Sequence, residues 1–220
     1  MPMIIGHRAL GVKETALGDF QMALDLRLEM VEFDLRLTGD GELVVFHGPP
    51  GMEGRRILAG KSYIEICQER ALIPPLFSDV VDLCGGKIRF DIEIKEDGIL
   101  PLVLDRLPDP DDHIITSFLD PVVAEARELG MNAGLVLGIA RASLSRRASE
   151  FFPSRRKRDC GADFLVPEYR IYKRSPQREA LRGSLAWGVN LPGQMSELSG
   201  DPAVAGVITD EPELARTYLR

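Results

Sequence analysis

The sequence lacks a disulfide framework, a long apolar run and an export signal. Its three cysteines, Cys67, Cys84 and Cys160, form no Cys-x-x-Cys pair and leave one residue over, so we expect reduced thiols. No stretch approaches the ~20 consecutive apolar residues that a transmembrane helix needs. The first residues run directly into an apolar segment without a charged leader or a small-residue cleavage site. We therefore expect a cytoplasmic protein without a transmembrane segment.

Positive charge is also scarce. The chain holds 27 Lys and Arg residues against 34 Asp and Glu residues, which gives a formal net charge of −7. Nucleic-acid binding depends on neutralising phosphates, so this charge excludes a general affinity for nucleic acid. A hydrophobic content of 45% over 220 residues is ordinary for a globular protein. We expect a single domain over residues 1–220, and the sequence leaves the oligomeric state open.

Residues 30–47 concentrate the side chains that carry chemistry. Side chains alternate along a strand, so Glu32 and Asp34 point to one face while their apolar neighbours point to the other. A Gly-Asp-Gly turn at residues 39–41 leads into a second apolar strand that ends at His47. Two acids on one face repel each other, and a divalent cation between them relieves the repulsion. The other interpretation is a surface hairpin with solvated acids and an incidental histidine.

Strand and helix patterns alternate along the chain. The expected strands are residues 3–8, 31–35, 43–46, 87–95, 114–118, 133–139, 163–166, 185–190 and 206–209. The expected helices are residues 17–28, 76–83, 121–129, 143–152, 176–181 and 213–219. Such alternation without a Gly-rich phosphate fingerprint favours a single parallel (β/α)8 TIM barrel over a doubly wound sheet, with a short hairpin after the second strand.

Polar residues lie toward the carboxyl ends of the expected strands. They are His7, Glu32, Asp34, Glu93, Lys95 and Ser117. The active sites of such barrels are built at this end, so we expect these residues to converge in space. Several inward acids need a compensating cation, because burying unpaired charge is costly. The alternative is that the acids form structural ion pairs with Arg8, Arg36, Arg89 and Lys95.

Several motifs along the chain resemble those of one known enzyme family. Gly6-His7-Arg8 resembles the family's H-R-G segment, Glu14 matches its P-E-N-T-L segment, and residues 31–34 match its I-E-x-D-V strand. Residues 38–47 resemble the T-K-D-G-x-x-V-x-H-D segment. The matches to N-I-E-I-K, S-S-F, W-T-V-N and G-I-I-T-D-x-P are residues 91–95, 117–118, 187–190 and 206–212. The matches keep the family's order over nearly the whole chain, and the chain therefore resembles the glycerophosphodiester phosphodiesterases, phospholipase-C-like enzymes with a TIM barrel.

The resemblance implies a metal-dependent enzyme that hydrolyses glycerophosphodiesters to glycerol 3-phosphate and an alcohol. The implied site residues are the catalytic pair His7 and His47, the metal ligands Glu32, Asp34 and Glu93, and the substrate contacts Arg8, Lys95, Ser117 and Trp187. Oxygen ligands that hold Mg²⁺ or Ca²⁺ suit this reaction, because the cation neutralises charge on the phosphoryl oxygens. Two imidazoles can divide proton removal and proton delivery.

The sequence departs from the family at several motif positions. Ala9 replaces the Gly of H-R-G, Lys13 and Thr15 replace the Pro and Asn of P-E-N-T, and Gly48 replaces the Asp after the second histidine. The segment that follows the second histidine is shorter than the family's usual insertion. A less covered site can admit an acyl chain, so a phospholipase-D-type phosphodiesterase of lysophospholipids or choline-headgroup lipids is an alternative. The departures leave a third hypothesis, a barrel that binds a phosphoester without turning it over.

Three further features each have two interpretations. His113 follows an acidic run at residues 109–112, and we expect a solvated loop histidine rather than a third catalytic one. Trp187 either walls the substrate pocket or packs in the core. A basic cluster within residues 141–158 is expected on the solvated side of an outer helix, and the alternative is weak contact with an anionic membrane surface.

Overall fold

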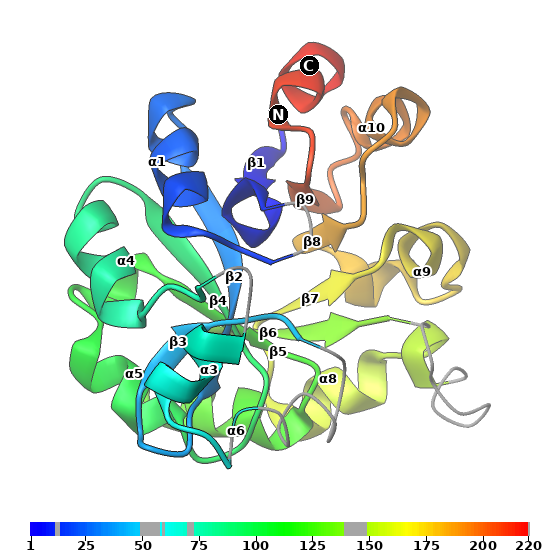
Figure 1. Ribbon diagram of the computed structural model, residues 1–220. Helices are drawn as coiled ribbons and strands as arrows, with labels where there is room; N and C mark the ends of the chain where they lie inside the picture. The colour runs from blue at the N-terminus through cyan, green and yellow to red at the C-terminus, as the bar shows by residue number, and fades with distance from the viewer. Residues whose placement is uncertain (12–13, 49–57, 59, 70–72, 139–148, 220) are drawn as a thin grey trace.

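The computed structural model describes residues 1–11, 14–48, 58, 60–69, 73–138 and 149–219, which form an α/β barrel (Figure 1). The parallel strands in these ranges are β1 (Met3–Gly6), β2 (Met30–Leu37), β4 (Arg89–Ile94), β5 (Ile114–Ser117), β6 (Asn132–Leu137), β7 (Phe164–Pro167), β8 (Ser184–Trp187) and β9 (Val204–Thr209). They pair in the order β7-β6-β5-β4-β2-β1-β9-β8. One parallel bridge, between Glu168 and Trp187, links the two ends of this order. The barrel is therefore nearly closed, and the predicted (β/α)8 fold class is confirmed.

Helices surround the strands (Figure 1). The α-helices are α1 (Leu17–Asp25), α3 (Tyr63–Glu69), α4 (Phe77–Cys84), α5 (Leu100–Arg106), α6 (Asp120–Glu128), α8 (Ser154–Cys160), α9 (Tyr169–Arg174), α10 (Pro192–Leu198) and α11 (Pro212–Tyr218). The 3₁₀ turns in the described part of the chain are η1 (His7–Leu10), η2 (Pro110–Asp112) and η3 (Arg178–Leu181). Within the described ranges, none of these helices has the length and apolarity to cross a membrane.

The helix predictions were right for the longer helices and incomplete for the short ones. Five short helices were not predicted, α3, α5, α8, α9 and α10, and each has only six or seven residues. So few residues show too little of the 3.6-residue period to stand out from a loop. The helix predicted at 176–181 is the turn η3, and most of the helix predicted at 143–152 lies outside the described residues.

The predicted hairpin after the second barrel strand is confirmed. Strand β3 (Leu43–Val45) pairs antiparallel with β2, with Leu35 opposite Val45. Gly41 has a φ of +90°, a backbone conformation that favours glycine, and it lies at the tip of the turn. The hairpin places His47 just beyond β3 on the carboxyl side of the barrel.

The main core lies between the barrel and its helices. Phe33 of β2 is fully buried there, and its ring meets Phe20 of α1 and Phe90 of β4 edge-on at 5.2 and 5.3 Å. These distances are typical of favourable aromatic pairs. Because β2 alternates, packing Phe33 outward directs Glu32 and Asp34 to the inside of the barrel.

A second apolar cluster lies beneath those acids. Its members are Ile5, Met30, Ile114, Val136, Val166, Leu185 and Ile208. Met30 shares the inward face of β2 with Glu32, two residues further along, so apolar side chains occupy the level below the acids. The inside of the barrel thus changes from apolar to acidic toward the carboxyl ends of the strands, where such barrels carry their sites.

Candidate active site

Three buried carboxylates lie together at the carboxyl ends of β2 and β4. Glu32 and Asp34 come from β2 and Glu93 from β4, and Asp34 is the direct register partner of Glu93. One oxygen of each can be chosen so that all lie within 4.8 Å of one another. The three residues are 3–8% exposed. The predicted convergence of the acids is therefore observed.

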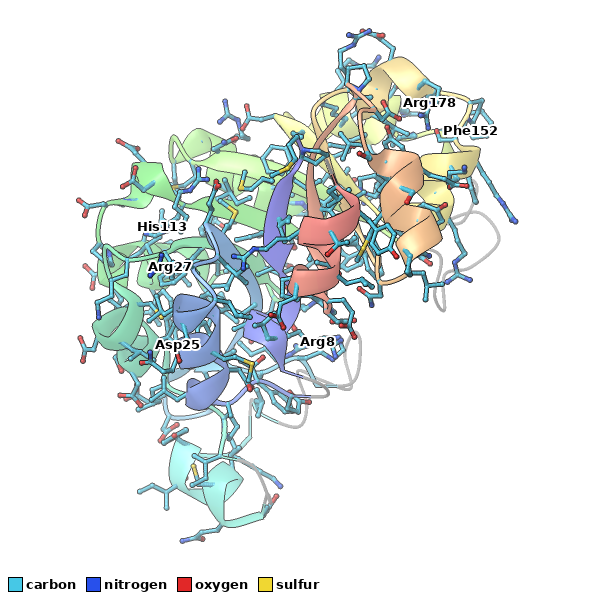
Figure 2. The ribbon with its side chains drawn as sticks, turned by 90° about the horizontal axis from the view of Figure 1, so that it is seen from above. Arg8, Asp25, Arg27, His113, Phe152 and Arg178 are labelled. Carbon is cyan, nitrogen blue, oxygen red and sulfur yellow. The ribbon has the colours of Figure 1, made fainter. Side chains whose placement is uncertain are left out.

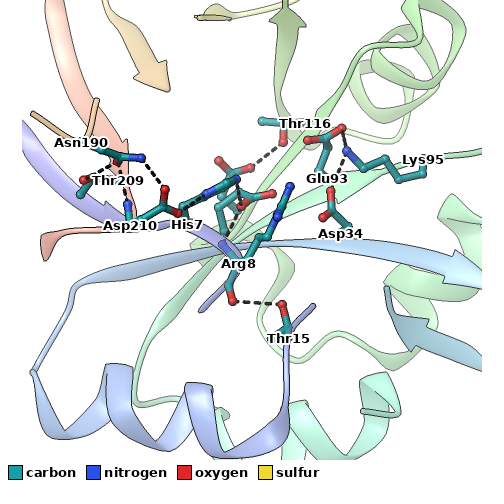
Figure 3. Close-up of polar contacts among 12 residues, drawn as sticks. His7, Arg8, Thr15, Asp34, Glu93, Lys95, Thr116, Asn190, Thr209 and Asp210 are labelled. Carbon is teal, nitrogen blue, oxygen red and sulfur yellow. Dashed lines mark hydrogen bonds and ion pairs between the residues drawn. The ribbon is translucent and has the colours of Figure 1, made fainter. Parts of the chain in front are cut away.

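Lys95 lies against two of the three acids (Figure 3). Its Nζ is 2.6 Å from Asp34 Oδ1 and also donates to Glu93. Burial raises the pKa of Glu93 to about 7, with Lys95 opposing this and the charges of Asp34 and Glu32 adding to it. For Asp34, burial is outweighed by Lys95, and the pKa is lowered. Part of the alternative interpretation is thus correct, because Lys95 forms an ion pair with the acids.

The donor set fits a divalent cation. Carboxylate oxygens are the ligands that Mg²⁺ and Ca²⁺ prefer. Lys95 supplies one positive charge to a buried group of three acids, and burial together with the Asp34 charge raises the pKa of Glu32. Negative charge in excess of the available counter-charge is what a cation relieves.

His7 is held by a chain of polar residues from β9 and the loop after β8. Its Nδ1 lies 2.5 Å from Asp210 Oδ1, and its Nε2 lies 3.9 Å from Glu32 Oε2. Asn190 donates to the second oxygen of Asp210 and accepts from the Asp210 amide and from Thr209 Oγ1, at 3.0 and 3.1 Å (Figure 3). Burial lowers the pKa of His7, but the Asp210 hydrogen bond and the charges of Glu32 and Asp210 outweigh it, so the pKa is raised.

The role of Asp210 was missed in the sequence. Asp210 was matched only as part of the closing G-I-I-T-D-x-P motif, and 203 residues separate it from His7. A carboxylate on one ring nitrogen fixes the tautomer and orientation of the imidazole. The one available signal was an acid directly after the last strand, at the end of the barrel where His7 was expected.

His47 has the opposite electrostatic environment. Burial lowers its pKa to about 4, the charge of Asp34 opposes this, and Arg8, Lys95 and His7 lower it further. The ring is therefore neutral at neutral pH. These electrostatic neighbours place His47 at the same end of the barrel as His7 and the acids.

Arg8 lies in the left-handed turn η1. Its backbone N–H donates to Glu32 Oε2 at 2.9 Å, and its carbonyl accepts from Thr15 Oγ1 at 3.0 Å. Arg8 and Ala9 both have a φ of +48°, and Leu10 has a φ of +78°. Three successive non-glycine residues in this region store strain, which is common next to functional groups.

Ser117 and Trp187 make contacts within the protein. The Ser117 hydroxyl is buried, donates to the Ile94 carbonyl at 2.7 Å and accepts from the Leu119 amide at 3.0 Å. Trp187 is half-buried, its Nε1–H donates to the Leu137 carbonyl at 3.0 Å, and its ring meets Phe118 edge-on at 6.4 Å. Ser117 is the last residue of β5. The roles of Ser117 and Trp187 in substrate binding stay predictions.

Asp91 is a fourth buried acid that the sequence analysis did not single out as a site residue. It lies on the inward face of β4 below Glu93, and its Oδ1 accepts from Thr116 Oγ1 at 2.6 Å. Burial raises its pKa well above the ordinary value, and the charge of Glu32 adds to this. Burial thus favours the neutral acid at Asp91, whose shape is close to that of the Asn at this position in the resembled motif.

The prediction of a solvated His113 was wrong. His113 is 6% exposed, and its ring stacks on Phe90 with centroids 4.8 Å apart. Its Nδ1 accepts the Phe90 N–H at 3.0 Å, and its Nε2 lies 3.1 Å from the Pro108 carbonyl. The acidic run beside it misled the interpretation, because the ring packs against Phe90 of β4.

Two of the other basic residues, Arg89 and Arg36, have other partners. Arg89 pairs with Glu29 at 3.5 Å, at the amino end of β4, and Arg36 donates to the backbone of His47. In the basic cluster, Arg156 points inward and pairs with Asp120 and with buried Glu150. Residues 141–148 of that cluster lie outside the described residues. Phe152, 54% exposed, lies with Arg178 at the end of the molecule away from α1 (Figure 2).

The chain is similar in sequence and fold to known phosphodiesterases. The family model "Glycerophosphoryl diester phosphodiesterase family" matches residues 6–60. The glycerophosphodiester phosphodiesterase of Thermotoga maritima is 22% identical, with a TM-score of 0.77, over 100% of this chain and 99% of that one. The Parabacteroides distasonis enzyme is 19% identical, with a TM-score of 0.76, over 99% and 96%.

A further solved structure contains a reaction product. It is an Oleispira antarctica phosphodiesterase in complex with the product sn-glycerol-3-phosphate, 16% identical with a TM-score of 0.75, over 100% of this chain and 97% of that one. At these identities the structural likeness shows the fold. No curated protein matches the chain significantly.

Proposed function

We propose that this chain, whose residues 6–60 match the glycerophosphoryl diester phosphodiesterase family model, hydrolyses glycerophosphodiesters to glycerol 3-phosphate and an alcohol. The observation that carries the proposal is the group of three buried carboxylates beside the His7–Asp210 pair. An acid cluster of this kind is costly to bury, and a metal-assisted reaction of an anionic substrate gives it a use.

Glu32, Asp34 and Glu93 are proposed to hold a divalent cation. When bound, the cation would neutralise negative charge on the phosphoryl oxygens of the substrate. Arg8 and Lys95 are the proposed cationic contacts to the phosphate, and Trp187 is the proposed apolar wall of the substrate pocket. Ser117, at the end of β5, is a further proposed contact to the substrate.

The contrast between the two histidines supports a division of labour. His47, with a pKa lowered to about 4 by burial and by nearby cations, is neutral and suits the general base. His7, whose pKa is raised through the Asp210 hydrogen bond despite burial, suits the general acid. His47 removes the proton from the attacking glycerol hydroxyl of the substrate as its oxygen bonds to phosphorus. The bond from phosphorus to the alcohol oxygen breaks, and His7 delivers a proton to that oxygen. Water then opens the resulting cyclic phosphate to give glycerol 3-phosphate.

The product bound to the Oleispira antarctica relative supports glycerol 3-phosphate as the product here. The alternative of a lysophospholipid substrate depended on the short segment after His47, and residues 49–57 lie outside the described residues. No described contact favours that alternative, so it enters as an outcome of the test.

Hydrolysis of a substrate panel tests the proposal. The purified protein is incubated with glycerophosphocholine, glycerophosphoethanolamine and lysophosphatidylcholine, with and without a chelator, and the products are identified. Release of glycerol 3-phosphate from the first two, abolished by the chelator and restored by Mg²⁺ or Ca²⁺, is expected. Cleavage of the lysolipid alone would replace the substrate assignment. Diester binding without any product would contradict the proposed function.

A further inference from the structure

Charged side chains hold the backbone at His47 from both sides. The carboxylate of Glu14 accepts the N–H of His47 and the N–H of Gly48, each at 3.1 Å. The guanidinium of Arg36 donates to the His47 carbonyl through Nε and Nη2, each at 3.3 Å. Glu14 precedes α1 and Arg36 belongs to β2, so two separate segments converge on one loop.

The backbone groups of His47 and Gly48 are bonded by a carboxylate and a guanidinium, although neutral groups can also bond a backbone. Arg36 is only 2% exposed, although burying a guanidinium is costly unless it is well satisfied. Hydrogen bonds to charged groups are roughly twice as strong as bonds between neutral groups. His47 itself lies beyond the end of β3, where strand pairing no longer holds the chain. The hydrogen bonds from Glu14 and Arg36 therefore hold the backbone just beyond the last residue of β3.

Gly48 makes the double contact to Glu14 possible. Two successive N–H groups can converge on one anion when the backbone turns through a left-handed residue. Gly48 has a φ of +58°, and a Cβ added there would lie 2.5 Å from Phe46 Cε1. An aspartate at this position, as in the resembled motif, does not fit this backbone without displacing the Phe46 ring.

The same short segment also reaches the loop of the other histidine. Thr15, next to Glu14, donates to the carbonyl of Arg8 at 3.0 Å, and Arg8 is adjacent to His7 (Figure 3). Residues 14 and 15 thus bridge the turn that carries His7 and the loop that carries His47. The bridge ties together two groups that must act on the same phosphorus.

We propose that Glu14 and Arg36 are positioning residues that fix the backbone of His47 so that its imidazole reaches the reacting hydroxyl. The inference rests on the proposed role of His47 as general base. Neither residue contacts the substrate in this proposal. A misplacement of about 1 Å can cost about 10²-fold in rate, so the effect is large enough to measure.

The test combines steady-state kinetics with the NMR signals of the histidine rings. The chain contains three histidines, so each ring can be assigned and followed. Glu14→Ala is expected to lower kcat about 10- to 100-fold with KM changed less than about twofold, and to shift the ring signals of His47 alone. Glu14→Gln retains a carbonyl acceptor for one of the two N–H groups, so it should recover part of kcat. Arg36→Met should act in the same direction as Glu14→Ala.

Asp163→Ala is the matched control. Asp163 also accepts a backbone N–H, that of Ala133 at 2.9 Å, and pairs with Arg127 at 2.8 Å, but it lies at the amino end of the barrel. The control should lose stability and keep its kcat and histidine signals. An equal loss of kcat in Asp163→Ala, or unshifted His47 signals in Glu14→Ala and Glu14→Gln, would overturn the proposal. Normal turnover by His47→Ala would instead refute the role of His47, while the NMR shifts would still report the positioning.

Discussion

At the scale of single residues, the site separates groups that move protons from groups that hold charge. His7 and His47 have shifted pKa values of opposite direction because one ring is hydrogen-bonded to Asp210 and the other is buried near cations. Glu32, Asp34 and Glu93 form a separate group whose oxygens lie close enough together to share a cation. These two sets should therefore fail differently when they are replaced.

Replacing a histidine should remove catalysis and leave cation binding intact. His7→Ala or His47→Ala removes a proton-transfer group, for which the expected loss is about 10²–10⁴ in kcat. Glu32→Ala or Asp34→Ala removes a proposed ligand, so raising the Mg²⁺ or Ca²⁺ concentration should restore part of the activity. The measurements are kcat as a function of metal concentration and metal affinity by calorimetry. Unchanged metal affinity in both acid variants would contradict the ligand assignment.

The strained turn η1 leads to a second prediction at this scale. Ala9 is fully buried and has a φ of +48°, where a Cβ costs about 1–2 kcal/mol. Ala9→Gly loses a buried methyl but relieves that strain, whereas Ala126→Gly, in the buried face of α6, loses the methyl and helix propensity together. The relieved strain and the helix propensity, which costs about 1 kcal/mol for Gly against Ala, act in the same direction, so Ala9→Gly should destabilise the protein by about 2–3 kcal/mol less than Ala126→Gly. Chemical denaturation of the two variants measures the difference, and a difference of about 1 kcal/mol or less, which helix propensity alone explains, would exclude strain at η1.

At the scale of elements, the imidazole of His113 holds the amino end of β4 through a backbone hydrogen bond. His113 accepts the N–H of Phe90 through Nδ1, so this contact requires the neutral ring. Burial lowers the pKa of His113, with the hydrogen bond to Pro108 and nearby acids opposing it. As the pH falls below the ordinary histidine value of about 6.5, the unfolded chain binds a proton before the folded one does. Stability contributed by His113 is thus complete above about pH 6.5 and is lost as the pH falls toward the folded pKa.

A variant at this position isolates that dependence. His113→Asn keeps an oxygen acceptor for the Phe90 N–H but does not titrate. It should be less stable than the natural protein at pH 8, because the stacking on Phe90 is lost, and the gap should narrow as the pH is lowered to 5. Urea unfolding at a series of pH values measures the gap. A gap independent of pH would show that His113 does not titrate in this range.

At the scale of the whole molecule, the two ends of the barrel have different roles. His113 and Asp163 tie loops to strands at the amino end. The carboxyl end carries a concentration of buried charge instead. The buried acids at the carboxyl end lower the free energy of unfolding, and a bound cation should restore part of that free energy.

Cation binding should raise the melting temperature. A ligand at 100 times its Kd stabilises the folded state by about 2.7 kcal/mol, or about 5–10 °C for a domain of this size. Lys95→Met removes the counter-charge of Asp34 and Glu93, so the chelated variant should melt below the chelated natural protein and gain more from the metal. Calorimetry with Mg²⁺, Ca²⁺ or chelator measures both effects. A shift of the same size in Asp34→Asn would place the stabilising ion elsewhere.

The residues alone predict the barrel, the hairpin and the convergence of the acids. Each of these follows from local rules: a period of two directs Glu32 and Asp34 to one face, and strand ends in a parallel barrel meet at one edge. The match of Glu14 to a motif could likewise be read in the chain, but its contact with the His47 backbone could not.

The partnerships between distant segments were decided by the closed barrel. Asp210 reaches His7 across 203 residues, His113 accepts the N–H of Phe90, and Lys95 lies between two acids. Whether two polar groups meet depends on distances of a few tenths of an ångström, and these arise only when all the strands pair and the helices pack against them. Periodicity predicts which face a side chain occupies, and tertiary packing decides which partner it finds there.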